Sequence, residues 1–214
     1  MKYKLFSFLF KNKAIIGVNL LGSYLFAKMA EDVIEKEYVV VIDRWISMHI
    51  NAVQTPLFNT VMLALTNFNG TIGISVFSAG MVLWFLSKKW YEELWFYLVS
   101  VVGANAAFVT VKMIVQRLRP DSELLSLSTY SFPSGHATMA TAMAMAVYFI
   151  FSQRVHRVSV RVCLLALCIS WIVLISFSRV YLDVHWLSDV IAGIGLGLFW
   201  VSFVVLVKRF MHTV

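Results

Sequence analysis

Apolar runs long enough to cross a lipid bilayer recur along most of this sequence. They cover residues 14–30, 71–87, 94–112, 136–152, 162–178 and 187–207. A transmembrane helix needs about 20 mainly apolar residues, within a range of about 17–25. Backbone amides and carbonyls find no water partner inside a bilayer, so such segments must be helical. The pattern therefore predicts an all-α, polytopic membrane protein with six transmembrane helices.

The composition favours a membrane protein and argues against a nucleic-acid-binding one. Of the 214 residues, 60% are hydrophobic and 14% are charged, whereas a soluble domain averages about 45–50% and about 25%. The formal net charge is +7, but no basic stretch alternates with stacking aromatics on a polar segment. Basic loops beside anionic lipid account for the charge. We expect residues 1–214 to form a single integral-membrane domain.

The charged residues also predict an orientation. With six spans and both termini in the cytoplasm, most of the 18 Lys and Arg residues lie in inner segments, as the positive-inside rule requires. Most of the 11 Asp and Glu residues then lie outside. The first run is the weakest, because Lys28 ends it, and a basic start with a short apolar core is also typical of a signal peptide. No small-residue cleavage site follows it, which favours a retained helix.

One outer segment, residues 31–70, is long but is not a span. Its apolar residues recur at helical spacing with polar residues between them. This pattern is typical of an amphipathic helix that lies along the membrane surface.

Three polar segments occur at the outer ends of the predicted spans. They are KMIVQRLRP (112–120), PSGH (133–136) and SRVYLDVHWLSD (178–189). Since all three fall on one side of the membrane, the fold can bring them together.

If the cations Lys112, Arg119 and Arg179 converge without matching acids, they require an anion as their partner. An ionisable group deep in a membrane costs about 2.5–3.5 kcal/mol on insertion scales, so it is rarely without a role. Guanidinium groups bind phosphate oxygens in bidentate fashion, and a lysine adds a point charge. We therefore expect the three cations to bind phosphate. Arg117 is interpreted differently, as a residue that snorkels to the interface from a helix end.

Ser134 and Gly135 open a helix after Pro133. The free backbone N–H groups at a helix start favour an anion, and glycine allows the backbone to approach it closely. His136 follows directly and can act as a general acid and then a general base.

His185 and Asp189 are four residues apart, so on a helix they share one face. A carboxylate on one ring nitrogen fixes the tautomer and raises the basicity of the other nitrogen. That nitrogen could then attack phosphorus and form a covalent phosphohistidine. The scheme requires no metal and no cofactor, because the cations neutralise the developing charge.

Together these residues resemble the signature of the type 2 phosphatidic acid phosphatase superfamily, the membrane lipid-phosphate phosphatases. Three motifs fit this signature without a gap. The first is Lys112, six residues and then Arg119-Pro120, and the second is Pro133 to His136. The third is Ser178-Arg179, five residues, His185, three residues and Asp189.

The resemblance implies that His185 is the nucleophile, Asp189 its orienting partner and His136 the acid. It also implies a set of phosphate-binding residues: Lys112, Arg119, Ser134, Gly135 and Arg179. Asp183 stands where the family often has glycine, and Leu187 where it often has proline. The carboxylate of Asp183 could repel a more anionic substrate or bind a substrate hydroxyl.

The expected activity is metal-independent hydrolysis of a lipid phosphate or diphosphate at the outer face of the cytoplasmic membrane. Phosphatidylglycerophosphate, phosphatidic acid and undecaprenyl diphosphate all carry a terminal phosphate on an apolar anchor, and the sequence does not choose among them. A lipid phosphotransferase would use the same residues. A transporter or scramblase that only binds the lipid phosphate would tolerate loss of His185 better than loss of the arginines. The oligomeric state stays open.

Overall fold

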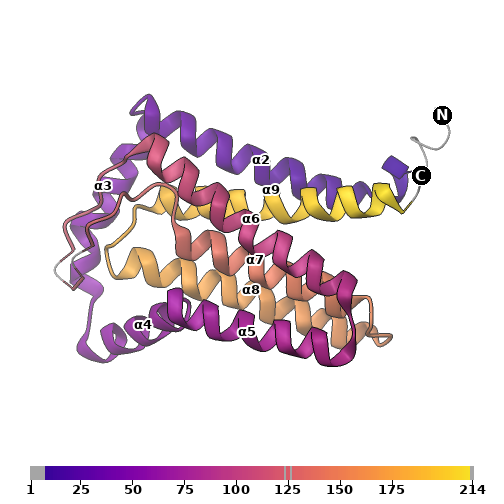
Figure 1. Cartoon of the computed structure of the whole chain (residues 1–214). Coiled ribbons are helices and arrows are strands. Elements are labelled where there is room, and N and C mark those ends of the chain that lie inside the picture. Colours follow the sequence, from indigo (N-terminus) through magenta and orange to yellow (C-terminus); the bar gives the residue numbers. More distant parts are fainter. Residues whose placement is uncertain (1–7, 123, 126, 213–214) are drawn as a thin grey trace.

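The computed structural model describes residues 8–122, 124–125 and 127–212, and this part of the chain is helical, without a β-strand. The long helices are α2 (Lys13–Ile34), α5 (Thr71–Lys88), α6 (Tyr91–Val115), α7 (Gly135–Ser152), α8 (Val158–Tyr181) and α9 (Leu187–Met211). They form a bundle, and α3 (Tyr38–Ile50) lies across one end of it (Figure 1). The short 3-10 helix η1 (Asn51–Val53) joins α3 to α4 (Pro56–Phe68) at the same end.

Five of the six predicted membrane segments form helices that are long and apolar enough to cross a bilayer. These are α5, α6, α7, α8 and α9. The first predicted segment, residues 14–30, forms most of α2, but α2 is not among the five candidate spans in the described chain. Its apolar run is interrupted by polar side chains such as Asn19 and Lys28. The protein is therefore an all-helical membrane protein with at least these candidate spans.

Helix α2 nevertheless packs closely along α9. A Cβ atom on Gly22 of α2 would lie 2.8 Å from the carbonyl oxygen of Gly195 in α9, so the two backbones nearly touch. Asn19 of α2 donates hydrogen bonds to the Ser202 hydroxyl (2.9 Å) and to the Phe199 carbonyl (3.0 Å) of α9. Small residues and interhelical hydrogen bonds of this kind hold helices together in membranes.

The predicted surface helix in residues 31–70 forms as two helices rather than one. Proline lacks a backbone N–H and is accepted in the first turn of a helix, and α4 begins at Pro56 with Thr55 as its N-cap. Helix α3 exposes large apolar side chains such as Trp45 and Met48, while Asp43 on the same helix is buried. The buried face of α3 is turned toward the loops that carry the polar segments.

Those loops lie at the same end of the bundle as α3. One loop connects α6 to α7, and a second, shorter one connects α8 to α9. The hydrogen bond from the Ser134 backbone N–H to the Asp189 carbonyl (2.9 Å) joins the starts of α7 and α9. The three polar segments of the sequence are thus brought together.

Candidate active site

A cavity of about 650 Å³ lies between the ends of the helices and receives residues from all three polar segments. The predicted site residues on its wall are Lys112, Arg119, Gly135, His136, Arg179 and His185. The other two, Ser134 and Asp189, are fully buried behind that wall.

His185 and Asp189 form a buried pair. The His185 Nδ1 atom lies 3.3 Å from Asp189 Oδ2, and both side chains are almost fully buried. A carboxylate only accepts hydrogen bonds, so the ring hydrogen belongs on Nδ1 and the lone pair on Nε2. Asp189 Oδ2 also accepts from the Trp186 backbone N–H (3.1 Å), which caps the start of α9. His185 therefore precedes the helix, instead of sharing a helical face with Asp189 as the spacing predicts.

The charge state of His185 follows from its surroundings. Burial holds its pKa well below the usual value, and the nearby cations Arg179, Arg119 and Lys112 lower it further. The imidazole is neutral at neutral pH, so the Nε2 lone pair is free of a proton.

Arg119 is fixed against the loops by several hydrogen bonds. Its Nε donates to the Thr129 carbonyl (2.6 Å), and its Nη2 donates to the Thr129 hydroxyl (2.9 Å). Its Nη1 lies 3.1 Å from His185 Nε2 and also donates to the Val184 carbonyl. Burial lowers the pKa of the guanidinium, while Asp189 raises it. Arg119 thus places a cation beside the unprotonated nitrogen of the histidine.

The other two cations have few partners. Lys112 Nζ donates to the Tyr130 carbonyl (2.9 Å). Arg179 is 2% exposed and donates from Nη1 to the Thr66 hydroxyl, but its Nε has no hydrogen-bond partner among the described residues. Since no acid pairs with either residue in the described chain, the cavity carries surplus positive charge.

The start of α7 supplies the remaining predicted residues. The Ser134 hydroxyl accepts a long hydrogen bond from the Ala137 N–H (3.4 Å) as the helix cap. Gly135 faces the cavity, where a Cβ atom would lie 2.9 Å from the Phe108 ring. The carbonyl of His136 accepts from Asn69 Nδ2 (3.1 Å), which ties α7 to the end of α4.

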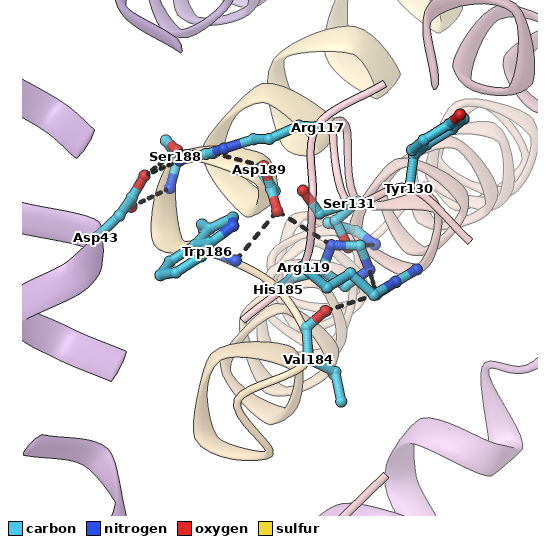
Figure 2. A network of polar contacts seen from close by, with 12 residues as sticks. Asp43, Arg117, Arg119, Tyr130, Ser131, Val184, His185, Trp186, Ser188 and Asp189 are labelled. Carbon is cyan, nitrogen blue, oxygen red and sulfur yellow. Dashed lines mark hydrogen bonds and ion pairs between the residues drawn. The ribbon is translucent and has the colours of Figure 1, made fainter. Parts of the chain in front are cut away.

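The interpretation of Arg117 as a snorkelling residue is wrong. Its side chain is 12% exposed and bridges two buried carboxylates: Nη1 lies 2.7 Å from Asp189 Oδ1, and Nη2 lies 2.8 Å from Asp43 Oδ2 (Figure 2). Asp43 also accepts from the backbone N–H of Ser188 (3.0 Å) and from its hydroxyl.

Asp43, Ser188 and Thr66 were not foreseen as part of the site. The one signal in the sequence was Asp43 itself, a carboxylate within the apolar run YVVVIDRWI.

Asp183 is turned away from the substrate cavity. It adopts a left-handed backbone conformation with φ of 50°, which explains why glycine suits this position. Its carboxylate accepts from the Ser47 hydroxyl of α3 (3.0 Å), and burial raises its pKa. Asp183 does not line the cavity. Neither hypothesis for this carboxylate, repulsion of a substrate or binding of its hydroxyl, gains support from this placement.

No group of three or more His, Cys, Asp and Glu side chains in the described chain lies close enough to hold a metal ion. Three cations, two histidines and neutral Ser, Thr and Asn side chains line the cavity, and no Asp or Glu of the described residues is on its wall, which suits an anion.

The sequence and the fold are both similar to those of known membrane phosphatases. Residues 93–211 match the model of the PAP2 superfamily. The chain is 30% identical over 182 residues to the phosphatidylglycerophosphatase B of Bacillus subtilis (strain 168), covering 82% of this chain and 87% of that protein. It is 31% identical to an undecaprenyl-diphosphatase of Sulfolobus acidocaldarius, covering 68% of this chain and 76% of the relative.

A solved structure has the same overall fold. The crystal structure of a transmembrane PAP2-type phosphatidylglycerolphosphate phosphatase from Bacillus subtilis superposes with a TM-score of 0.72 at 26% identity. The superposition covers 94% of this chain and 96% of the other. The described helices thus follow an arrangement that occurs in a membrane phosphatase.

Proposed function

The chain belongs to the PAP2 superfamily and is a membrane phosphatase, and on that premise we propose that it hydrolyses a lipid phosphate through a phosphohistidine on His185. The observation that carries this proposal is the position of the His185 ring. Its Nδ1 faces the Asp189 carboxylate, and its Nε2 faces the cavity beside Arg119. A nucleophile that is oriented on one side and lies next to a phosphate-binding cation on the other suits attack on phosphorus.

In the first step, the Nε2 lone pair attacks phosphorus and the bond from phosphorus to the lipid oxygen breaks. The departing oxygen takes a proton from His136, which lines the same cavity. Positive charge develops on the His185 ring as the phosphorus–nitrogen bond forms, and the Asp189 carboxylate stabilises that charge. Lys112, Arg119 and Arg179 balance the charge on the phosphoryl oxygens.

In the second step, water attacks the phosphorus of the phosphohistidine. His136 takes the proton from the water, the phosphorus–nitrogen bond breaks, and inorganic phosphate leaves with His185 regenerated. The start of α7 contributes here as well: Gly135 faces the cavity, and the backbone N–H groups of the first turn favour an anion. Ser134 would assist by capping that turn and keeping its amides directed at the phosphate.

The substrate is proposed to be a lipid because apolar side chains share the cavity with the cations. Ile74 of α5 and Val101, Val102 and Phe108 of α6 line it, so a hydrocarbon chain could lie between these helices. Phosphatidylglycerophosphate is the first candidate, since relatives named for that activity match the chain over most of its length. Phosphatidic acid and undecaprenyl diphosphate present the same terminal phosphate.

The proposed topology has six spans, with α2 as the sixth, and both termini in the cytoplasm. Helix α2 is 22 residues long and packs against α9, which is itself a candidate span. The positive-inside distribution then puts the cavity and helix α3 on the outer face of the cytoplasmic membrane. A cysteine introduced at an exposed α3 position, such as Met48, should react with an impermeant maleimide added to intact cells.

The activity is tested by phosphate release from the three lipids with detergent-purified protein, with a chelator present throughout. We expect release by the wild type, loss of release in His185→Ala, and full release in His49→Ala. His49 is the matched control because it is an exposed histidine on α3 that stacks on Trp45 and does not line the cavity. Radiolabelled phosphate should also be trapped on the wild-type protein, in an acid-labile form. Release that persists in His185→Ala would exclude the phosphohistidine route.

A further inference from the structure

A buried chain of charged groups connects helix α3 to the proposed nucleophile. It runs from Asp43 on α3 through Arg117 to Asp189, and from there to His185. The side chains of Asp43 and Asp189 are both 0% exposed. Figure 2 shows Arg117 reaching between the two carboxylates. These contacts bring together parts of the sequence that are far apart: helix α3, the loop between α6 and α7, and the start of α9.

The two oxygens of the Asp189 carboxylate have different partners. Arg117 Nη1 binds Oδ1 at 2.7 Å, so Oδ2 is left to face His185 Nδ1 and the Trp186 backbone N–H. Arg117 therefore determines the rotation of the carboxylate about its own axis. Bonds between a guanidinium and a carboxylate have fixed geometry, which makes them suited to such positioning.

Asp43 in turn fixes Arg117 and balances its charge. It binds Nη2 of the guanidinium at 2.8 Å and holds the start of α9 through the Ser188 backbone N–H at 3.0 Å. Without Asp43, the full positive charge of Arg117 would act on Asp189 alone. That would reduce the negative charge that Asp189 offers to the His185 ring as the ring becomes positive during attack on phosphorus.

We propose that Asp43 and Arg117 are positioning residues of the phosphatase reaction, which act through Asp189 to orient and activate His185. Helix α3 is then part of the support of the active site and not only a surface helix. A second contact, from the Ser47 hydroxyl to Asp183 at 3.0 Å, joins α3 to the loop that carries His185. This inference rests on the proposed function, since it assigns a role in the same reaction.

The test compares Asp43→Asn with Asp32→Asn. Asp32 is the matched control because its side chain is also buried and also pairs with a cation, Lys28 Nζ at 2.7 Å, and it does not line the cavity. Asparagine keeps the size of the side chain and an oxygen for the Ser188 N–H, but it removes the charge and replaces the oxygen that accepts from Arg117 with an amide nitrogen that cannot accept. We expect kcat of Asp43→Asn to fall about 10- to 100-fold, by analogy with the outer hydrogen-bond partners of metal-bound histidines, whose loss has effects of this size. KM should stay unchanged, because the substrate does not touch Asp43.

Removing Arg117 alone leaves two buried carboxylates without a cation, and such a protein can fail to fold. The double variant Asp43→Asn with Arg117→Gln reduces this problem, since it removes one negative and one positive charge together and leaves only the Asp189 carboxylate without its cation. We expect it to fold, to bind substrate with an unchanged KM, and to show a kcat at least as low as that of Asp43→Asn. The rate of phosphohistidine formation in a rapid-quench experiment should fall by the same factor as kcat.

The outcomes separate this inference from the proposed function. A drop in kcat for Asp43→Asn but not for Asp32→Asn, with similar thermal midpoints, would establish the positioning role. If His185→Ala is inactive while Asp43→Asn and the double variant keep the wild-type kcat, the contacts are merely structural and the inference is wrong. If His185→Ala keeps its activity, the phosphohistidine proposal itself fails, and the role proposed for Asp43 and Arg117 fails with it.

Discussion

Replacing Arg179 with methionine should make the protein more stable and less active. The guanidinium is buried, donates from Nη1 to the Thr66 hydroxyl, and leaves its Nε without a partner among the described residues. Arg119 and Lys112 line the same cavity and repel it. In the absence of phosphate, Arg179 is thus a buried cation with an unpaired donor, and methionine fills a similar volume without either cost.

The size of the effect follows from the contacts. A buried donor that is left unpaired costs about 1–3 kcal/mol, and an apolar replacement of a buried charge often gains a similar amount. For a chain of about this size, 1 kcal/mol shifts the thermal midpoint by about 2–4 °C. We therefore expect the midpoint of Arg179→Met to rise by roughly 3–10 °C. Loss of two charge-assisted bonds to phosphate, at about 1.5–3 kcal/mol each, should lower kcat/KM at least about 100-fold.

The assay is thermal unfolding in detergent, with and without inorganic phosphate, for Arg179→Met and Arg117→Met. Both arginines are buried or nearly so, but Arg117 pairs with two carboxylates, and breaking such a pair costs about 3–5 kcal/mol. The same substitution should therefore raise the midpoint at one position and lower it at the other. Phosphate at about 100 times its Kd should stabilise the wild type by about 2.7 kcal/mol and should have little effect on Arg179→Met.

Two results would contradict this reasoning. A lower midpoint for Arg179→Met would mean that the guanidinium is well satisfied without phosphate. An undiminished response of the variant to phosphate would mean that Arg179 does not bind it.

Two further predictions concern stability. Asp183→Asn keeps an acceptor for Ser47 and suits the left-handed backbone, and it removes a carboxyl whose pKa is raised by burial. A raised carboxyl pKa opposes folding once the pH exceeds the unfolded value of about 4. The variant should therefore be more stable than the wild type at pH about 8 and no more stable near pH about 3.5. A gain of equal size at both pH values would disprove the electrostatic cause. Gly193→Ala would put a Cβ atom 2.6 Å from the Ser134 carbonyl oxygen and should lower both the thermal midpoint and kcat. In the control Gly80→Ala, the Cβ atom meets nothing within 4 Å, and the variant should gain up to about 1 kcal/mol of stability from helix propensity. Equal midpoints for the two variants would show that α7 and α9 can move apart freely.

Much of the fold was predictable because the bilayer limits the choices. Apolar runs of membrane length can only be helices, and five of them are α5 to α9. The gathering of Lys112, Arg119, His136 and His185 around one cavity was also predictable, because each lies at or near the same end of a predicted span. Such inferences depend only on local sequence patterns and on the fact that consecutive spans cross the membrane in opposite directions.

The support of the site was not predictable for the opposite reason. Asp43 and Asp189 are brought onto one guanidinium by the fold of α3 over the end of the bundle, and no local pattern encodes that contact. Amphipathic spacing in residues 31–70 predicts a helix with one apolar face, but it does not say that the opposite face buries a carboxylate. Arg117 was misinterpreted because a cation near a helix end has the same local appearance whether it faces lipid headgroups or a buried acid.

The buried charges at this end of the bundle fall into two groups with different balance. We call the group around Arg117 closed, because each carboxylate oxygen in it accepts a hydrogen bond from within the protein. This group needs no ligand to hold it together. We call the group formed by Lys112, Arg119 and Arg179 open, because these three cations face the cavity and no acid among the described residues pairs with them there. The closed group borders the open one at His185, which contacts Asp189 on one nitrogen and Arg119 on the other. A phosphate dianion that enters the cavity would neutralise the open group while the closed group holds the histidine in place, so binding energy and orientation come from separate sets of residues.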